Sequence, residues 1–176
     1  MASPHQKAII NGVTMRESKS AGAKTKCSKI VLNPRALDIV WGGNNRYWDY
    51  VKDQQSECAM LKSVCWLEVS GRVDLDKLIP STDYQIKFSV RLNENASGWD
   101  KDVIFKARVG YNVARTTRCK LIKNKQFYEV PNELTFKTPK KSSGGRLSFG
   151  MYEIEGQAWK SGLLIEKITI SQVNPA

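Results

Sequence analysis

The stretch YQIKFSVRL, residues 84–92, alternates apolar side chains with mostly polar ones. Its apolar positions are Tyr84, Ile86, Phe88, Val90 and Leu92. Successive side chains of a β-strand point to opposite faces, so a period of two places these side chains together on one face. The stretch therefore predicts a β-strand with one face in a hydrophobic core and the other face toward polar surroundings.

The same period recurs along the chain. It runs through residues 103–113 and returns in LSFGMYEIE (147–155) and LLIEKITISQV (163–173), with Gly-, Pro- and Asn-rich turns between the runs. Helix candidates are short: ECAMLKS (57–63) has room for one or two turns, and 74–78 for another. We predict an all-β fold, a two-sheet antiparallel β-sandwich of jelly-roll type with few short helical turns.

The first part of the chain differs in composition from the rest. Residues 1–28 are rich in Lys, Ser, Ala and Gly, which predicts a flexible basic leader before a β-sandwich domain at 29–176. No stretch approaches the roughly 20 apolar residues that a spanning helix requires. The N-terminus also lacks the continuous apolar segment of a secretory signal. We therefore predict no membrane span and a cytoplasmic or nucleocytoplasmic location.

Positive charge is concentrated in two regions. The net charge is +11; residues 1–33 carry six Lys and Arg against one acid, and residues 101–146 carry twelve against three. Such a distribution predicts a basic face, which serves either to keep the protein in solution by self-repulsion or to contact nucleic acid or another polyanion.

The residue inventory argues against catalysis. The only histidine, His5, lies in the predicted leader, so no imidazole is expected in the folded domain. Glu153 and Glu155 share one face of a strand and have the residue types of a glycoside hydrolase pair, but exposed surface acids are the simpler interpretation. The cysteines have no C-x-x-C spacing, and reduced thiols are expected. The alternative is intermolecular crosslinking, most readily at Cys27, which lies in a Lys-rich segment and is expected to be exposed. We predict no enzyme, no metal and no cofactor.

Tryptophan is the more informative residue type. Trp66, within SVCWLEV, is expected in the core. Trp41 and Trp48 flank a turn-rich loop, whose polar side chains are Asn44, Asn45 and Arg46. The negative face of an indole attracts the C–H bonds of a pyranose, and amide and charged groups bind its hydroxyls. The same layout could stack a nucleobase beside an arginine, so the residues alone leave both ligands open.

Three blocks extend this pattern. LDIVWGGNNRYWDY (37–50), AMLKSVCWLEVSGRVD (59–74) and GGRLSFGMYEIEGQAWKSGLLIEKITI (144–170), in this order, resemble the phloem lectins, the Nictaba-like family of plant proteins. The resemblance covers about residues 30–172. It implies a β-sandwich that binds N-acetylglucosamine oligomers, as in chitin fragments and the core of N-glycans, without catalysis or a required metal, and that forms homodimers.

The resemblance also implies site residues. Trp41 and Trp48 match the aromatic residues that shape the sugar site in the family. The downstream candidates are Glu153, Glu155, Trp159 and Lys160. The sequence departs from the family pattern at Asn44 and Asn45, where an acid and a proline are often expected, and at Lys167, which replaces a small residue.

Three hypotheses follow. The first is a lectin for N-acetylglucosamine oligomers and N-glycosylated proteins, with the phloem-sap location and defence role that the resemblance implies. The second is a basic RNA-binding protein that uses residues 101–146 on phosphates and exposed aromatics on bases. The third is a glycoside hydrolase, which would release shorter sugars from chitin oligomers.

Overall fold

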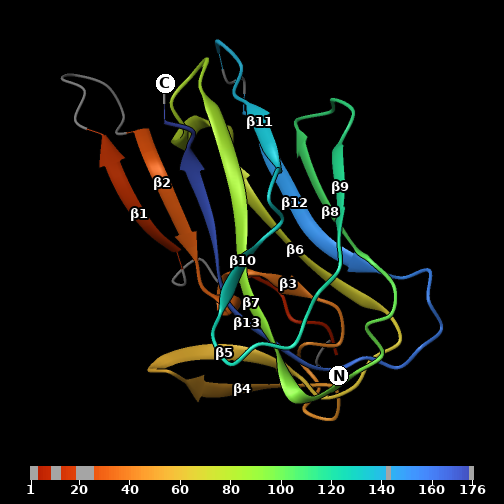
Figure 1. Ribbon diagram of the computed structural model, residues 1–176. Coiled ribbons are helices and arrows are strands. Elements are labelled where there is room, and N and C mark those ends of the chain that lie inside the picture. The colour runs from red at the N-terminus through yellow and green to blue at the C-terminus, as the bar shows by residue number, and fades with distance from the viewer. Residues whose placement is uncertain (1–3, 9–12, 19–25, 142–143, 175–176) are drawn as a thin grey trace.

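The computed structural model describes residues 4–8, 13–18, 26–141 and 144–174, and it shows two antiparallel β-sheets that pack face to face (Figure 1). This arrangement confirms the predicted β-sandwich. The larger sheet consists of β1 (Val13–Ser18), β2 (Lys26–Leu32), β4 (Trp48–Asp53), β5 (Ser56–Leu61), β7 (Asp83–Ser97), β10 (Tyr128–Val130), β11 (Thr135–Lys137) and β13 (Ser161–Gln172). The smaller sheet has the order β3 (Asp38–Ile39), β6 (Leu67–Asp74), β12 (Arg146–Glu153), β8 (Val103–Val109), β9 (Arg115–Cys119).

The strand β13 joins the parts of the larger sheet. Along one edge it pairs with β7, from Ser161 opposite Ser97 to Gln172 opposite Tyr84. Along its other edge it pairs first with β5 and then with β2. The strands β10 and β11 pair with the remaining edge of β7. The larger sheet therefore depends on two long neighbouring strands, β7 and β13.

The hydrophobic core lies between the sheets. The apolar side chains of residues 84–92 are all buried, as their alternation predicts. Phe88 of β7 meets the smaller sheet at Phe105 of β8 and Phe149 of β12, with edge-on ring contacts at centroid distances of 5.0 and 6.3 Å. Edge-to-face contacts of this kind are favourable beyond simple burial of area. They tie the two sheets together near the middle of the sandwich.

Two local predictions have different outcomes. Residues 74–78 contain the 3-10 helix η3 (Leu75–Lys77), as expected, and a second 3-10 helix, η2 (Pro34–Ala36), lies before β3. The helical interpretation of 57–63 is wrong, because most of this segment belongs to β5, which forms a hairpin with β4 and also pairs with β13. Backbone pairing on both sides outweighs the modest helix propensity of the segment.

Some of the segment that was predicted as a leader contacts the sandwich. The strand β1 pairs with β2, and Gln6 forms a two-way backbone bridge with Ile39 at the edge of the smaller sheet. Cys27 lies in β2 and is buried, so the expectation that it is exposed is wrong. Its carbonyl accepts a hydrogen bond from the Tyr84 hydroxyl at 2.7 Å, which holds this strand against β7.

Candidate functional site

The loop between Trp41 and Trp48 is a succession of tight turns. The backbone N–H of Asn44 donates to the carbonyl of Trp41 at 3.0 Å, and the N–H of Trp48 donates to the carbonyl of Asn44 at 3.1 Å. The Asn44 side-chain oxygen accepts from the N–H of Arg46 at 3.0 Å, which closes an Asx turn. Asn44 is half-buried, whereas Asn45 and Arg46 are exposed. The loop therefore has a defined shape and presents its central polar side chains to solvent.

Trp41 has a constrained backbone and an accessible ring. Its φ of 65° lies in the left-handed region, which costs a non-glycine residue about 1–2 kcal/mol. Its backbone N–H donates to Nδ1 of His5 at 2.9 Å, and its ring contacts the rings of His5 and Tyr47, each at a centroid distance of 5.2 Å. Trp41 is nevertheless 37% exposed. Strained residues of this kind concentrate at binding sites, where the surrounding structure holds them in place.

Trp48 lies in the interior instead. It begins β4, is 2% exposed and belongs to the hydrophobic core. Its indole Nε1 has no hydrogen-bond partner among the described residues. The structure thus separates the two predicted tryptophans: Trp41 is accessible to a ligand, and Trp48 supports the loop from beneath.

Glu153 and Lys160 form a buried ion pair. Both side chains are almost entirely enclosed. The Lys160 ammonium also donates to the carbonyls of Cys65, at 2.6 Å, and Ala158, at 3.1 Å, while the Glu153 carboxylate accepts from the N–H of Gly156 at 2.8 Å. The three donors of the ammonium therefore all have acceptors. A buried pair of charges is retained only with this kind of hydrogen bonding.

The ion pair fixes the connection between β12 and β13. The buried pair anchors the first and last residues of 153–160 in the interior. Between them, Glu155 and Trp159 are exposed to solvent, Trp159 to 59%. Gly98 supports the same connection: its φ is 87°, and a Cβ at this position would lie 2.1 Å from the Trp159 carbonyl oxygen. The glycine permits a close approach that any side chain would prevent.

Trp66 is 47% exposed, so the prediction that it lies in the core is wrong. Its Nε1 donates to the Glu68 carboxylate at 2.7 Å. The strand pattern explains the difference, because Leu67 and Val69 point inward and residues of the opposite parity, including Trp66 and Glu68, point outward. That parity was the signal in the sequence that would have placed Trp66 on the surface.

Three exposed tryptophans gather at one end of the smaller sheet, which we call the aromatic end: Trp41, Trp66 and Trp159. The N–H of Val40, beside Trp41, donates to the carbonyl of Glu68 at 3.1 Å. A two-way backbone bridge joins Val64 to Lys160, so the residues before Trp66 lie against the residue that follows Trp159. These backbone contacts place three distant parts of the sequence at the same end of the smaller sheet.

Polar groups surround the aromatic end. A cavity of about 400 Å³ lies beside Glu155, where β12 ends and β8 begins. Its charged side chains are Lys101, Asp102, Arg118, Glu153 and Glu155, and its apolar ones are Ile104 and Ile154. Exposed indoles and a charged, partly apolar hollow at the same end of the smaller sheet are suited to a ligand that has both C–H faces and hydroxyl groups.

The described residues contain no cluster of three or more His, Cys, Asp or Glu side chains placed to hold a metal ion. Within the same residues, no helix has the length and apolar character needed to span a bilayer.

Comparison with known proteins identifies the family. The family model described as Phloem protein 2 matches residues 26–172, and the chain belongs to this family. It is 30% identical over 147 residues to phloem protein 2-like A1 of Arabidopsis thaliana, covering 80% of this chain and 60% of that one. It is 32% identical over 161 residues to phloem protein 2-like A9 of the same plant, covering 81% and 87%. A protein named lectin from Luffa acutangula is 28% identical over 170 residues, covering 92% and 78%.

The family match begins at residue 26, yet residues before it contact the loop that carries Trp41. His5 contacts the Trp41 ring, and Gly43 donates its N–H to the carbonyl of Pro4 at 2.9 Å. Sequence reasoning placed His5 in a leader and gave it no role. The backbone pairing of Gln6 with Ile39 and the hydrogen bond between Pro4 and Gly43 hold this segment beside the loop. No local pattern in the sequence predicts these long-range contacts.

Proposed function

We propose that this protein is a non-catalytic lectin that binds N-acetylglucosamine oligomers at the aromatic end. The observation that carries the proposal is the gathering of three exposed indoles, Trp41, Trp66 and Trp159, at one end of the smaller sheet. The relationship to a Luffa protein named lectin supports the same class of ligand. Location in phloem sap is part of this proposal, and the phloem protein 2 family supports it.

The indoles would stack on the C–H faces of the sugar rings, and the nearby polar groups would bind hydroxyl and acetamido groups. Polar candidates at the rim are Asn45, Arg46, Glu68 and Glu155. Separate indoles suit an oligomer better than a single ring, because an open surface gains modest free energy from each ring that it contacts. Affinity is therefore expected to rise from the monosaccharide to the trisaccharide.

Three of the residues that the family resemblance implies have a supporting role in this proposal. Trp48, Glu153 and Lys160 are buried, and they hold the two connections that carry Trp41 and Trp159. The carboxylate of Glu153 is engaged by Lys160 and by the N–H of Gly156, so it is not free to act with Glu155 as a hydrolytic pair. This engagement supports binding without hydrolysis.

The proposal is tested by calorimetric titration with N-acetylglucosamine, its dimer and its trimer at low and high salt. Trp41→Ala, Trp66→Ala and Trp159→Ala are each expected to weaken trimer binding roughly 2- to 12-fold, the range for one aromatic contact. Tyr111→Ala is the matched control, because Tyr111 is an exposed aromatic at the other end of the sheet. Unchanged trimer affinity in all three tryptophan variants would refute the site.

Salt and reaction products separate the alternatives. Binding of a neutral sugar should hardly respond to salt, whereas binding of RNA falls steeply as salt rises. Long incubation with chitin oligomers is expected to give no shorter products by chromatography, and their appearance would favour a hydrolase.

A homodimer and N-glycosylated protein partners also belong to this proposal. Two sites in one dimer would raise the apparent affinity for a glycoprotein with several N-glycans well above that for a free trimer. Sedimentation measures the dimer directly. Equal affinity for the glycoprotein and the trimer would argue against two linked sites.

A further inference from the structure

The end of the smaller sheet opposite the aromatic end contains a basic pocket. It has a volume of about 610 Å³, and its charged lining residues are Arg72, Arg108, Lys141 and Arg146. None of its described lining residues is Asp or Glu. The wall also includes glycine backbone, which leaves room for a ligand to approach the main chain. A pocket with several cations and no acid in its wall is complementary to a phosphate group.

The cations of this basic pocket are only partly neutralised. Arg72 and Arg146 form ion pairs at its rim, with Asp38 at 3.4 Å and Asp74 at 3.6 Å, and both arginines are more than half exposed. Exposed pairs of this kind contribute little to stability. Arg108 and Lys141 make no ion pair with any residue that the structure describes.

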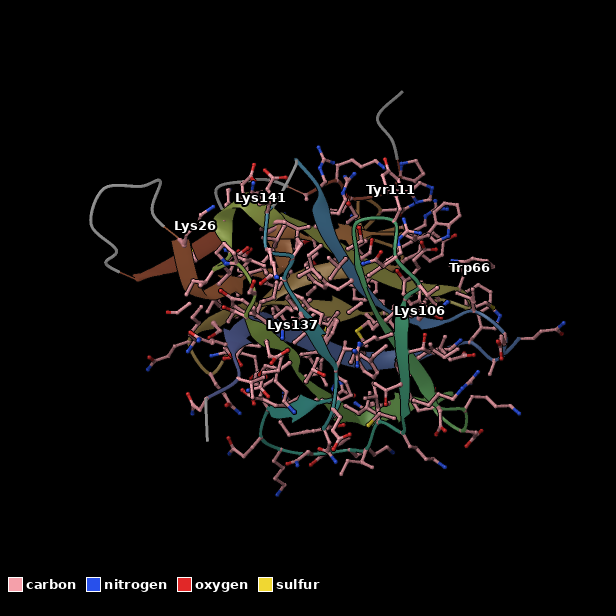
Figure 2. The ribbon with its side chains drawn as sticks, turned by 90° about the horizontal axis from the view of Figure 1, so that it is seen from above. Lys26, Trp66, Lys106, Tyr111, Lys137 and Lys141 are labelled. Atoms are coloured by element: carbon pink, nitrogen blue, oxygen red, sulfur yellow. The ribbon has the colours of Figure 1, made fainter. Side chains whose placement is uncertain are left out.

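An apolar hairpin tip stands beside the pocket. The connection between β8 and β9 reads GYNVA, residues 110–114, and contains no charged residue. Tyr111 is 100% exposed and Val113 is 94% exposed. Figure 2 looks onto this end of the molecule, with Tyr111 and Lys141 both labelled there. The tip is flanked along the chain by Arg108 and Arg115, which are both exposed.

We infer that this end of the protein docks on an anionic phospholipid surface. Lipid phosphates would occupy the basic pocket, while Tyr111 and Val113 would enter the interfacial layer of the bilayer. Tyrosine is favoured in that layer, and each Lys or Arg near an anionic bilayer adds to the attraction. RNA would also use the cations and could stack on Tyr111, but it offers no favourable environment for Val113.

Docking at this end leaves the aromatic end free. Trp66 precedes β6 and Asp74 ends it, so the two ends are separated by the length of an eight-residue strand, about 23 Å. The inference is therefore independent of sugar binding. Loss of lipid binding should leave sugar titrations unchanged, and failure of the lectin proposal would not affect lipid binding.

The test is sedimentation of the full chain with vesicles of phosphatidylcholine alone and with vesicles of equal parts phosphatidylcholine and phosphatidylserine. We expect binding to the second kind only. Arg108→Gln and Lys141→Gln should each weaken binding about five-fold, with Lys52→Gln, an exposed lysine of the larger sheet, as the unaffected control.

Val113→Ser is the deciding variant, and Ile122→Ser, at an exposed branched apolar residue outside the hairpin tip, is its control. On a bilayer, Val113→Ser should weaken binding several-fold while Ile122→Ser does not, because only Val113 would enter the apolar layer. Three results would overturn the inference: no sedimentation with anionic vesicles, equal binding by both serine variants, or tighter binding to a single-stranded RNA that depends on Arg108 but not on Val113.

Discussion

Removal of the Lys160 ammonium tests how the site is held. Lys160→Met keeps most of the side-chain volume but leaves the Glu153 carboxylate enclosed without its cation. The carbonyls of Cys65 and Ala158 also lose their donor. Breaking a buried pair from one side costs about 3–5 kcal/mol, because an uncompensated charge stays in the interior. For a chain of this size that loss lowers the melting temperature by roughly 6–20 °C.

The assay is reversible thermal or urea unfolding of the wild type, Lys160→Met and the double variant Glu153→Leu with Lys160→Met. The double variant should recover much of the loss, since replacement of both members by apolar groups removes the unpaired charge. A destabilisation by Lys160→Met of less than about 1 kcal/mol would refute the reasoning, because a loss that small is typical of an exposed pair. Equal losses in the single and double variants would also contradict it.

Further predictions concern the two connections and the core. Gly98→Ala should destabilise the protein by at least about 1–3 kcal/mol in urea unfolding and also weaken sugar binding, because the added Cβ displaces the Trp159 backbone. His5→Ala should weaken trimer binding roughly 2- to 12-fold in calorimetry, whereas His5→Asn, which retains an acceptor near Nδ1, should lose less. Burial raises the pKa of Tyr50 from 10.0 to about 12, against a smaller opposing effect of Arg35. As the pH rises, the Tyr50 hydroxyl ionises in the unfolded chain before it does so in the folded one. The free energy of unfolding should therefore be constant with respect to this group below pH 10 and fall as the pH rises toward 12, and the fall should be smaller for Tyr50→Phe in parallel urea titrations.

The sequence predicted the sandwich well because strand alternation is local. In YQIKFSVRL each apolar side chain is buried as the period requires. The same alternation places Leu67 inward and therefore Trp66 outward. In β12 the inward positions Leu147, Phe149 and Met151 are followed, two residues further on, by Glu153, which the alternation also places inward. A buried acid could thus have been anticipated from the pattern. Its partner could not, because Lys160 reaches it only through the turn geometry of residues 154–159.

The site was less predictable than the fold. Trp41 was named from its loop, but its neighbourhood depends on the strand order of the smaller sheet, which places β3 beside β6 and β6 beside β12. Strand order is a long-range property that no short window of sequence encodes. The contact between His5 and Trp41 depends in the same way on the bridge between Gln6 and Ile39, which are 33 residues apart in the sequence.

The position of β13 has a consequence for how the chain acquires its structure. This strand pairs with β2, β5 and β7, all of which precede it in the sequence. During synthesis these three strands are therefore made before the strand that completes the larger sheet. Until then their unpaired edges are available to other chains, and contacts of such long sequence separation form slowly. The nascent protein therefore passes through a period of vulnerability to aggregation that ends only when residues 161–172 emerge, and chaperone protection would matter most in that interval.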